Sequence, residues 1–190
     1  MTSPVASRYL RVPEDTRLVR EFIRQNSQDK FELFYVGMAN CEDFFSWYTV
    51  GFGLGKKVKW SGCDIQNVQL FRNEIGDVNF QIGHFSGMLK LDYYDIVICN
   101  YVFEPTDVNV EALIVNKPML VICRNNFLPL EELQEKLKDY TIWEHTNQYD
   151  IDTDGCKMRN VNYLWFRKDV AIPTNKYIRL KRCLVNDQGE

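Results

Sequence analysis

Hydrophobic residues along this chain gather in short continuous runs, and between these runs they recur at helical spacing. Continuous apolar runs of this length are typical of strands buried on both faces of a parallel sheet, whereas the spacing between them is typical of amphipathic helices. Strands that alternate with helices predict an α/β domain with a mainly parallel sheet. The predicted strands cover residues 31–36, 58–64, 78–82, 95–99 and 118–123.

The predicted helices carry start signals in the sequence. Pro13 suits a first helical turn and precedes an apolar stripe. Asn40 is a candidate N-cap for a helix directly after the first strand, and Pro129 opens a helix whose apolar face includes Leu137. A shorter helix is expected over residues 107–115. Helices placed after strands supply the crossovers that a parallel sheet requires.

The pattern changes after residue 140. Residues 141–149 and 161–168 are two strand-like runs, and Asp154-Gly155 between them favours a turn. The pair is therefore predicted to form an antiparallel hairpin. His145 lies on the first of these runs, and we expect it to be a hydrogen-bonded structural histidine.

One domain is expected across residues 1–190, because the length suits a single core and no linker-like stretch interrupts the chain. Residues 1–12 are predicted to be a lead-in and residues 171–190 a basic tail. The cations of this tail could contact nucleic-acid phosphates, although a solvated end is the favoured interpretation. They are Lys176, Arg179, Lys181 and Arg182.

Composition narrows the choice of compartment and partner. A formal net charge of −3 gives no general attraction to nucleic acid or anionic lipid. No apolar run approaches the about 20 residues that span a bilayer, and the N-terminus lacks the apolar core of a signal peptide. The six cysteines contain no Cys-x-x-Cys pair, so we expect free thiols and no zinc site. We therefore expect a soluble intracellular protein, cytoplasmic or nuclear, without membrane contact or bound metal.

Candidate chemistry gathers where predicted strands end. Gly37 follows the first strand at its handover to a helix, which is where open α/β sheets bind cofactors. Asp64 ends the second strand, where an acid can accept hydrogen bonds from ribose hydroxyls; capping the next helix is an equally good interpretation. Asn100 follows the fourth strand. Glu42 and Asp43, near the expected start of the first crossover helix, would repel a pyrophosphate and so disfavour NAD or ATP.

The order of these elements resembles the class I S-adenosylmethionine (AdoMet) methyltransferase fold over about residues 13 to 170. The resemblance implies a three-layer, Rossmann-like α/β domain whose mostly parallel, seven-stranded sheet ends in the C-terminal antiparallel hairpin. It also implies AdoMet as the cofactor. AdoMet carries a positive sulfonium and no phosphate, so the acids at the helix start are compatible with it.

The middle of the chain also resembles the non-SET histone lysine methyltransferases. Residues 83–85 (GHF) are similar to that family's Gly-Asp-Phe step, and residues 100–105 (NYVFEP) to its Asn-Asn-Phe-x-Phe-x-Pro step. This resemblance implies that Asn100 positions the target through its amide and carbonyl. It implies that Tyr101 and Phe103 form the walls of the site and make cation–π contacts. Ordinary core or loop roles for these two aromatic residues are the alternative.

The first motif of the family departs from its usual pattern here. Tyr35 stands where the family has an acid, Gly37 keeps the first glycine, and Ala39 and Cys41 replace the next two. A Cβ at such positions blocks close approach of a ligand or disfavours a positive φ. His84 replaces a further acid, although a neutral imidazole can still accept one hydrogen bond. By position, the resemblance assigns cofactor contacts to Tyr35, Gly37, Ala39, Asp64, His84 and Phe85.

Two functions are compatible with these features. One is an AdoMet-dependent methyltransferase that acts on a macromolecule, with protein lysine as one possible target. The other is a catalytically inactive methyltransferase-like module that serves as a protein-interaction or scaffold subunit, because the cofactor motif is degenerate. This second function predicts that bulky side chains such as Tyr35 and Phe44 fill the cofactor cleft.

Overall fold

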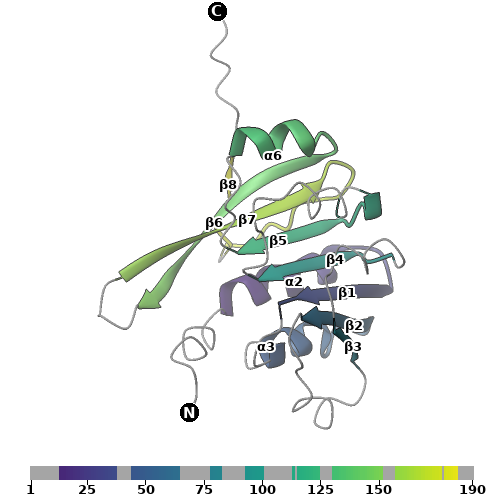
Figure 1. Cartoon of the computed structure of the whole chain (residues 1–190). Helices are drawn as coiled ribbons and strands as arrows, with labels where there is room; N and C mark the ends of the chain where they lie inside the picture. Colours follow the sequence, from purple (N-terminus) through teal and green to yellow (C-terminus); the bar gives the residue numbers. More distant parts are fainter. Residues whose placement is uncertain are drawn as a thin grey trace, which may run out of the picture.

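The computed structural model contains one mixed sheet of eight strands (Figure 1). The structure describes residues 13–37, 44–64, 78–82, 93–100, 113, 115–124, 130–151, 157–176 and 178–183. The strands are β1 (Lys30–Val36), β2 (Lys57–Asp64), β3 (Asn79–Ile82), β4 (Ile96–Asn100), β5 (Leu120–Arg124), β6 (Tyr140–Ile151), β7 (Lys157–Arg167) and β8 (Lys181–Arg182).

The strands lie side by side in the order β3-β2-β1-β4-β5-β7-β6-β8. The first five pair in parallel, with β1 between β2 and β4. The five strands predicted from the apolar runs are confirmed, with ends shifted by one or two residues. Asp95 precedes β4, and its carboxylate accepts the Glu32 N–H at 2.8 Å, which fixes the start of β4 beside β1.

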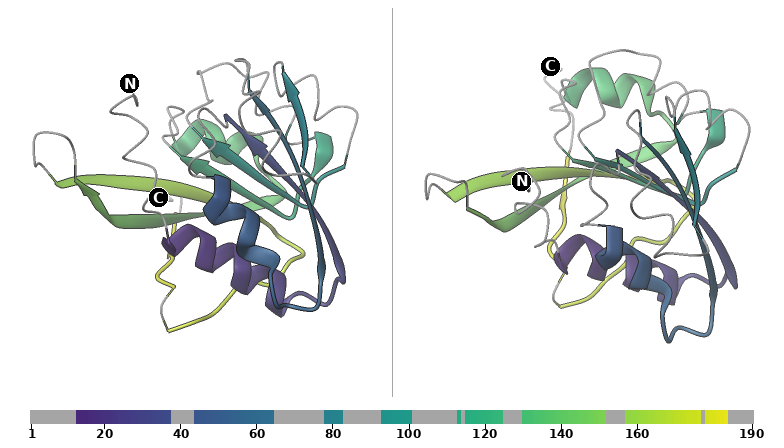
Figure 2. Two further views of the ribbon diagram at one scale, coloured as in Figure 1. Left: turned by 90° about the horizontal axis from the view of Figure 1, so that it is seen from below. Right: turned by 60° about the horizontal axis from the view of Figure 1, so that its bottom comes forward.

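Helices cover both faces of the sheet. Helix α2 (Pro13–Gln25) and helix α3 (Phe44–Tyr48), which continues into the short 3-10 helix η1 (Thr49–Gly51), lie on one face, and α6 (Leu130–Lys136) lies on the other (Figure 2). The start of α2 at Pro13 is confirmed. The predicted three-layer α/β arrangement is therefore correct.

Two helix predictions need qualification. Helix α6 ends at Lys136, so Leu137 does not belong to it, yet Leu137 is buried in the core on the α6 face. The predicted N-cap Asn40 and most of the predicted helix over residues 107–115 lie outside the described residues.

Alternation along β1 supplies the core on both faces. Leu33 and Tyr35 pack into the cluster beneath α2 and α3, whereas Phe34 and Val36 pack into the cluster on the α6 side. A strand buried on both faces in this way needs an almost continuous apolar sequence. Helix α2 contributes its predicted stripe to the first cluster through Leu18, Val19, Phe22 and Ile23.

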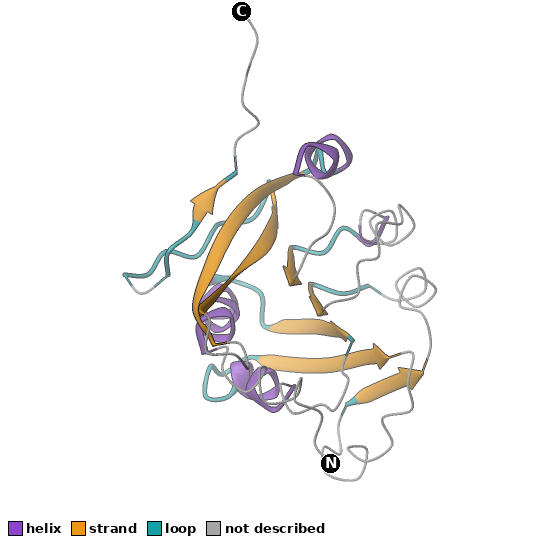
Figure 3. Ribbon diagram, turned by 60° about the vertical axis from the view of Figure 1, so that its left-hand side comes forward, coloured by secondary structure: helices purple, strands orange, loops and turns teal. Residues whose placement is uncertain are grey.

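The C-terminal antiparallel hairpin is confirmed, and it is longer than predicted. β7 pairs with β5 only from Asn162 to Phe166, and β6 pairs with β8 only at Trp143 and Glu144. The rest of the hairpin, residues 146–151 and 157–161, pairs within itself and projects from the sheet (Figures 1 and 3). We call this part the distal hairpin.

The predicted basic tail is only partly a tail. From residue 171 the chain passes α2, where the Gln25 side-chain amide donates to the Thr174 carbonyl at 3.2 Å (Figure 2). Ile172, Ile178 and Leu180 pack against the core, and β8 then adds an eighth strand to the edge of β6. The sheet therefore has eight strands where seven were predicted, and the apolar residues of segment 171–183 pack against the core while its cations are exposed.

No helix among the described residues is long and apolar enough to cross a membrane.

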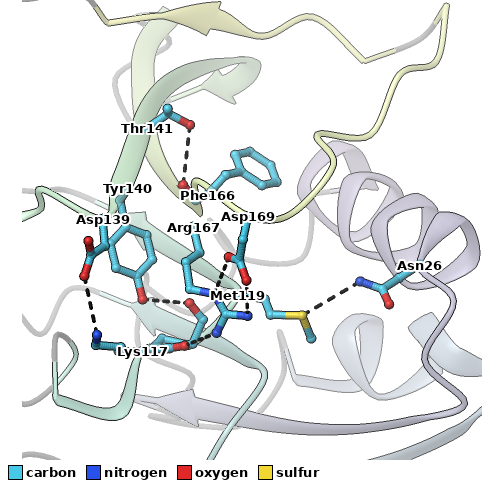
Figure 4. Close-up of polar contacts among 10 residues, drawn as sticks. Asn26, Lys117, Met119, Asp139, Tyr140, Thr141, Phe166, Arg167 and Asp169 are labelled. Carbon is cyan, nitrogen blue, oxygen red and sulfur yellow. Dashed lines mark hydrogen bonds and ion pairs between the residues drawn. The ribbon is translucent and has the colours of Figure 1, made fainter.

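A polar network holds the edge of the sheet at which the parallel strands begin (Figure 4). The Tyr140 hydroxyl donates to the Pro118 carbonyl at 2.7 Å, and burial raises the pKa of Tyr140. Arg167 donates to the Lys117 carbonyl at 2.6 Å and pairs with Asp169 at 2.5 Å. These contacts join the hairpin to the start of β5.

We expect Tyr140→Phe to lower the free energy of unfolding by about 1 kcal/mol, because the buried Pro118 carbonyl loses its donor. Tyr48→Phe is the matched control, since its hydroxyl makes no hydrogen bond to the described residues, and we expect a change below about 0.5 kcal/mol. Urea unfolding of the two variants measures both values. Equal losses in the two variants would contradict this role for the Tyr140 hydroxyl.

Candidate functional site

Three of the predicted site residues lie at one level of the sheet. Val36 at the end of β1 pairs with Cys63 of β2 and with Cys99 of β4. The next residues along these three strands are Gly37, Asp64 and Asn100. The structure therefore brings these residues together at the carboxyl edge of three adjacent parallel strands, where α/β sheets bind ligands.

Gly37 has the backbone conformation that this position was predicted to need. Its φ is 75°, in the left-handed region that residues with a Cβ avoid. Its N–H donates to the Cys63 carbonyl at 3.0 Å, so the turn is held against the end of β2. The chain therefore leaves β1 through a fixed turn beside Asp64.

Asp64 is the last residue of β2 and is only 9% exposed. A carboxylate at this level can accept two hydrogen bonds from a vicinal diol such as that of ribose. The carboxylate also acts on its neighbour: burial, then the nearby Cys99 and Asp64, raise the pKa of Cys63 to about 12. Burial and the neighbouring Asp64 thus help keep the Cys63 thiol protonated.

Tyr35 lies on β1 directly before Val36, and its ring belongs to an aromatic cluster. Its ring meets Phe44 edge-on at a centroid distance of 5.6 Å and Trp47 at 6.3 Å. Phe44 in turn meets Trp60 of β2 at 5.2 Å. Tyr35 is 1% exposed, so its ring belongs to the core beneath α3. A direct contact between Tyr35 and a cofactor stays a prediction.

The remaining predicted site residues are not described by the structure. Ala39, His84, Phe85, Tyr101 and Phe103 lie outside the described residues, so their cofactor or catalytic roles stay predictions. Asn100 is placed by its backbone at the end of β4, where it pairs with Arg124 of β5.

The row of paired residues that contains Asn100 continues across the sheet into the hairpin. Arg124 pairs with Asn162 of β7, and Asn162 pairs with His145 of β6. His145 Nδ1 lies 2.6 Å from Asp15 Oδ1 in the first turn of α2, and both side chains are buried. The prediction of a hydrogen-bonded structural histidine is confirmed.

Asp15 was not predicted from the sequence as the partner of His145. The two residues are 130 positions apart, and nothing in either local pattern indicates the contact. The pair fastens α2 to the hairpin at the level of the candidate site.

The thiols of the core lie just below the site. Cys63, Cys99 and Cys123 occupy one register row and are free and buried. Burial is the main cause that raises the pKa of both Cys63 and Cys123. Within the described parts of the chain, no three His, Cys, Asp or Glu side chains gather as metal ligands.

Comparison with known proteins bears on the fold. No protein-family model and no curated protein matches the sequence. A structure from Listeria monocytogenes described as a class I S-adenosylmethionine-dependent methyltransferase matches with a TM-score of 0.57 at 12% identity, over 85% of this chain and 61% of that chain. M. capricolum TrmK, solved with S-adenosyl-homocysteine, matches with a TM-score of 0.54 at 15% identity, over 84% and 71%.

The chain has the fold of the class I S-adenosylmethionine-dependent methyltransferases. The spermidine synthase of Thermotoga maritima matches this chain as well as TrmK does, with a TM-score of 0.54 at 10% identity over 84% of this chain and 60% of that chain. Because that protein is named for another reaction, the fold does not decide the chemistry. The chain spans only 61% of the Listeria structure and 48% of a Streptococcus mutans methyltransferase.

We expect the buried thiols to resist alkylation in the folded methyltransferase-like domain. Iodoacetamide reacts with thiolates, and a raised pKa keeps Cys63 and Cys123 protonated at pH 8. Cys183, whose pKa burial also raises, is partly exposed, so it is the internal control for access and should be labelled before these two thiols. Peptide mapping by mass spectrometry follows each site. Labelling of Cys63 and Cys123 at the rate of Cys183 in native buffer would show that this part of the core opens freely.

Proposed function

We propose that this chain binds AdoMet at the carboxyl edge of β1, β2 and β4 and transfers its methyl group to a macromolecule. The observation that carries the proposal is the common level of Gly37 and Asp64 at the tips of the two adjacent strands β1 and β2. The fold similarity supports AdoMet over other nucleosides, since TrmK was solved with S-adenosyl-homocysteine.

The residues at the edge fit an adenosyl group. Asp64 offers a nearly buried carboxylate as an acceptor for the ribose hydroxyls, and a hydrogen bond to a charged group is among the stronger ones. Gly37 has no Cβ at the turn and adopts a positive φ there, which permits close approach of a ligand to the backbone. Asn100, at the same level on β4, is the group that we assign to positioning the acceptor.

The chemical demands on the protein are small. AdoMet, when bound, supplies a methyl group already activated by its sulfonium. The chain must therefore align the acceptor behind that methyl and exclude water from it. If the acceptor is a lysine amine, the site must also hold it neutral. We assign Tyr101 and Phe103 to the walls of the acceptor site, because the resemblance to the non-SET histone lysine methyltransferases implies this role for them.

The distal hairpin supports a macromolecular acceptor. His145 and Asn162 lie at the level of the strand tips, and the hairpin continues past them to Ile151 before it returns from Lys157. Six further residues of strand extend about 20 Å. A two-stranded arm beyond the edge of the candidate site offers a surface larger than a small molecule needs. It suits a protein or another polymer as the substrate.

A second candidate function is a binding module without catalysis. The packing of Tyr35 against Phe44 and Trp47 favours it, because this degenerate motif position is filled by the core. The two candidates differ in one measurable respect. The enzyme transfers radiolabelled methyl from AdoMet to protein in a cell extract, and the binding module does not.

We expect Asp64→Asn to weaken AdoMet binding by about 10-fold or more, because a charged acceptor of the ribose hydroxyls is lost. Asp29→Asn is the matched control, since Asp29 is exposed just before β1 at the opposite edge of the sheet. Isothermal titration calorimetry measures both affinities. No heat in the unmodified protein at saturating AdoMet, or the same affinity in all three proteins, would reject the proposed site.

We expect Gly37→Ala and Gly53→Ala to cost similar stability, about 1 kcal/mol, because both glycines have a φ near the same left-handed value, 75° and 72°. A Cβ at Gly53 meets nothing within 4 Å, so strain is its only effect. AdoMet affinity should fall for Gly37→Ala alone. If Gly53→Ala weakens AdoMet binding equally, the loss reflects general destabilisation.

A further inference from the structure

A hollow of about 210 Å³ opens between α6, the start of β6 and β8. Lys138, Lys168 and Arg182 line it, and apolar side chains including Leu137 and Ile142 complete the lining. It lies by the first residues of β6, whereas the candidate cofactor site lies where the parallel strands end. The hollow is therefore separate from that site.

The charged residues that line the hollow have one sign. None of its lining residues is acidic, and no ion pair joins Lys138, Lys168 or Arg182 to a carboxylate in the described parts of the chain. Asp139, next in sequence to Lys138, faces Lys117 at 3.5 Å instead. The chain as a whole carries a net charge of −3, so three unpaired cations around one small hollow contrast with the negative charge of the whole chain. A concave surface lined by one sign of charge concentrates counter-ions of the other.

Gln134 of α6 contributes to the wall of the hollow. Its side-chain NH₂ donates to the Cys183 carbonyl at 3.3 Å, which sets the orientation of the amide. The other atom of that amide, Oε1, is buried and has no hydrogen-bond partner among the described residues, so it faces the interior and not the hollow.

The walls of the hollow are held by ordered structure. The Cys183 N–H donates to the Ile142 carbonyl at 2.9 Å, directly after β8, and Lys168 N–H donates to the Asp139 carbonyl at 2.8 Å. Arg182 is thus fixed beside β6 by pairing with Trp143. The cations of the hollow come from three segments distant in sequence, so a loose basic tail does not account for them.

We propose that this hollow binds the phosphate of a small phosphate monoester. The phosphate oxygens accept from Lys138, Lys168 and Arg182, which line it. The volume is below the 300 Å³ or so of a typical ligand pocket, so it admits one sugar phosphate unit and not a whole nucleotide. A free sugar phosphate and a ribose phosphate at an RNA end share this chemistry.

Ribose 5-phosphate titrated into the full chain at fixed ionic strength tests the proposal by calorimetry. We expect saturable binding that weakens at least about fivefold in Lys168→Gln and in Arg182→Gln, each of which removes one cation. Gln134→Glu, of nearly the same shape, places a negative charge in the wall of the hollow and should abolish binding. Lys30→Gln, an exposed lysine at the start of β1, is the matched control and should bind as the unmodified protein does.

Thermal unfolding of each variant checks that its fold is retained. Absence of saturable binding, or the same affinity in the pocket variants and in Lys30→Gln, overturns the proposal. A 5′-phosphorylated RNA trimer distinguishes the two sources: competition with ribose 5-phosphate assigns the hollow to an RNA end, and binding of the sugar phosphate alone assigns it to the free molecule. RNA binding that ribose 5-phosphate does not compete with and that survives in Arg182→Gln contradicts the site. AdoMet affinity is measured beside these titrations, so failure here leaves the proposed function standing or falling on its own result.

Discussion

The structure depends on the burial of β1 in the middle of the parallel sheet. β1 hydrogen-bonds to β2 on one side and to β4 on the other, and its side chains alternate between two cores. A one-residue slip of β1 would exchange the side chains facing α2 and α3 with those facing α6. Register is therefore fixed, and with it the level at which Gly37, Asp64 and Asn100 leave their strands.

The fixed register also places core aromatic residues directly beside the candidate site. The face beneath α3 is filled by Tyr35, Phe44, Trp47 and Trp60, which stabilise the sheet through aromatic contacts close to its carboxyl edge. A ligand at that edge must lie on top of this cluster, against the turn at Gly37 and the carboxylate of Asp64. Residues that stabilise the sheet and residues that would bind the ligand are thus neighbours along the same strands.

Much of the fold could be predicted from the sequence, because buried parallel strands need continuous apolar runs and these are visible. The distal hairpin was underestimated because polar residues such as those from 146 to 151 show no hydrophobic alternation outside a core. β8 was missed because Lys181-Arg182 is too short and too charged to read as a strand; only its pairing with β6 reveals it. The contact between Asp15 and His145, and the cation-lined hollow, depend on residues far apart in sequence that only the folded chain brings together.

The central claim is that an adenosyl ligand lies against the turn after β1 and the tip of β2. Hydrogen exchange followed by mass spectrometry, with and without saturating AdoMet, tests this location most directly. Slower exchange in the peptides that contain Gly37 and Asp64, with peptides of α6 and β8 unchanged, is the expected result. Unchanged exchange at both strand tips, or slowing confined to other parts of the sheet, would contradict it.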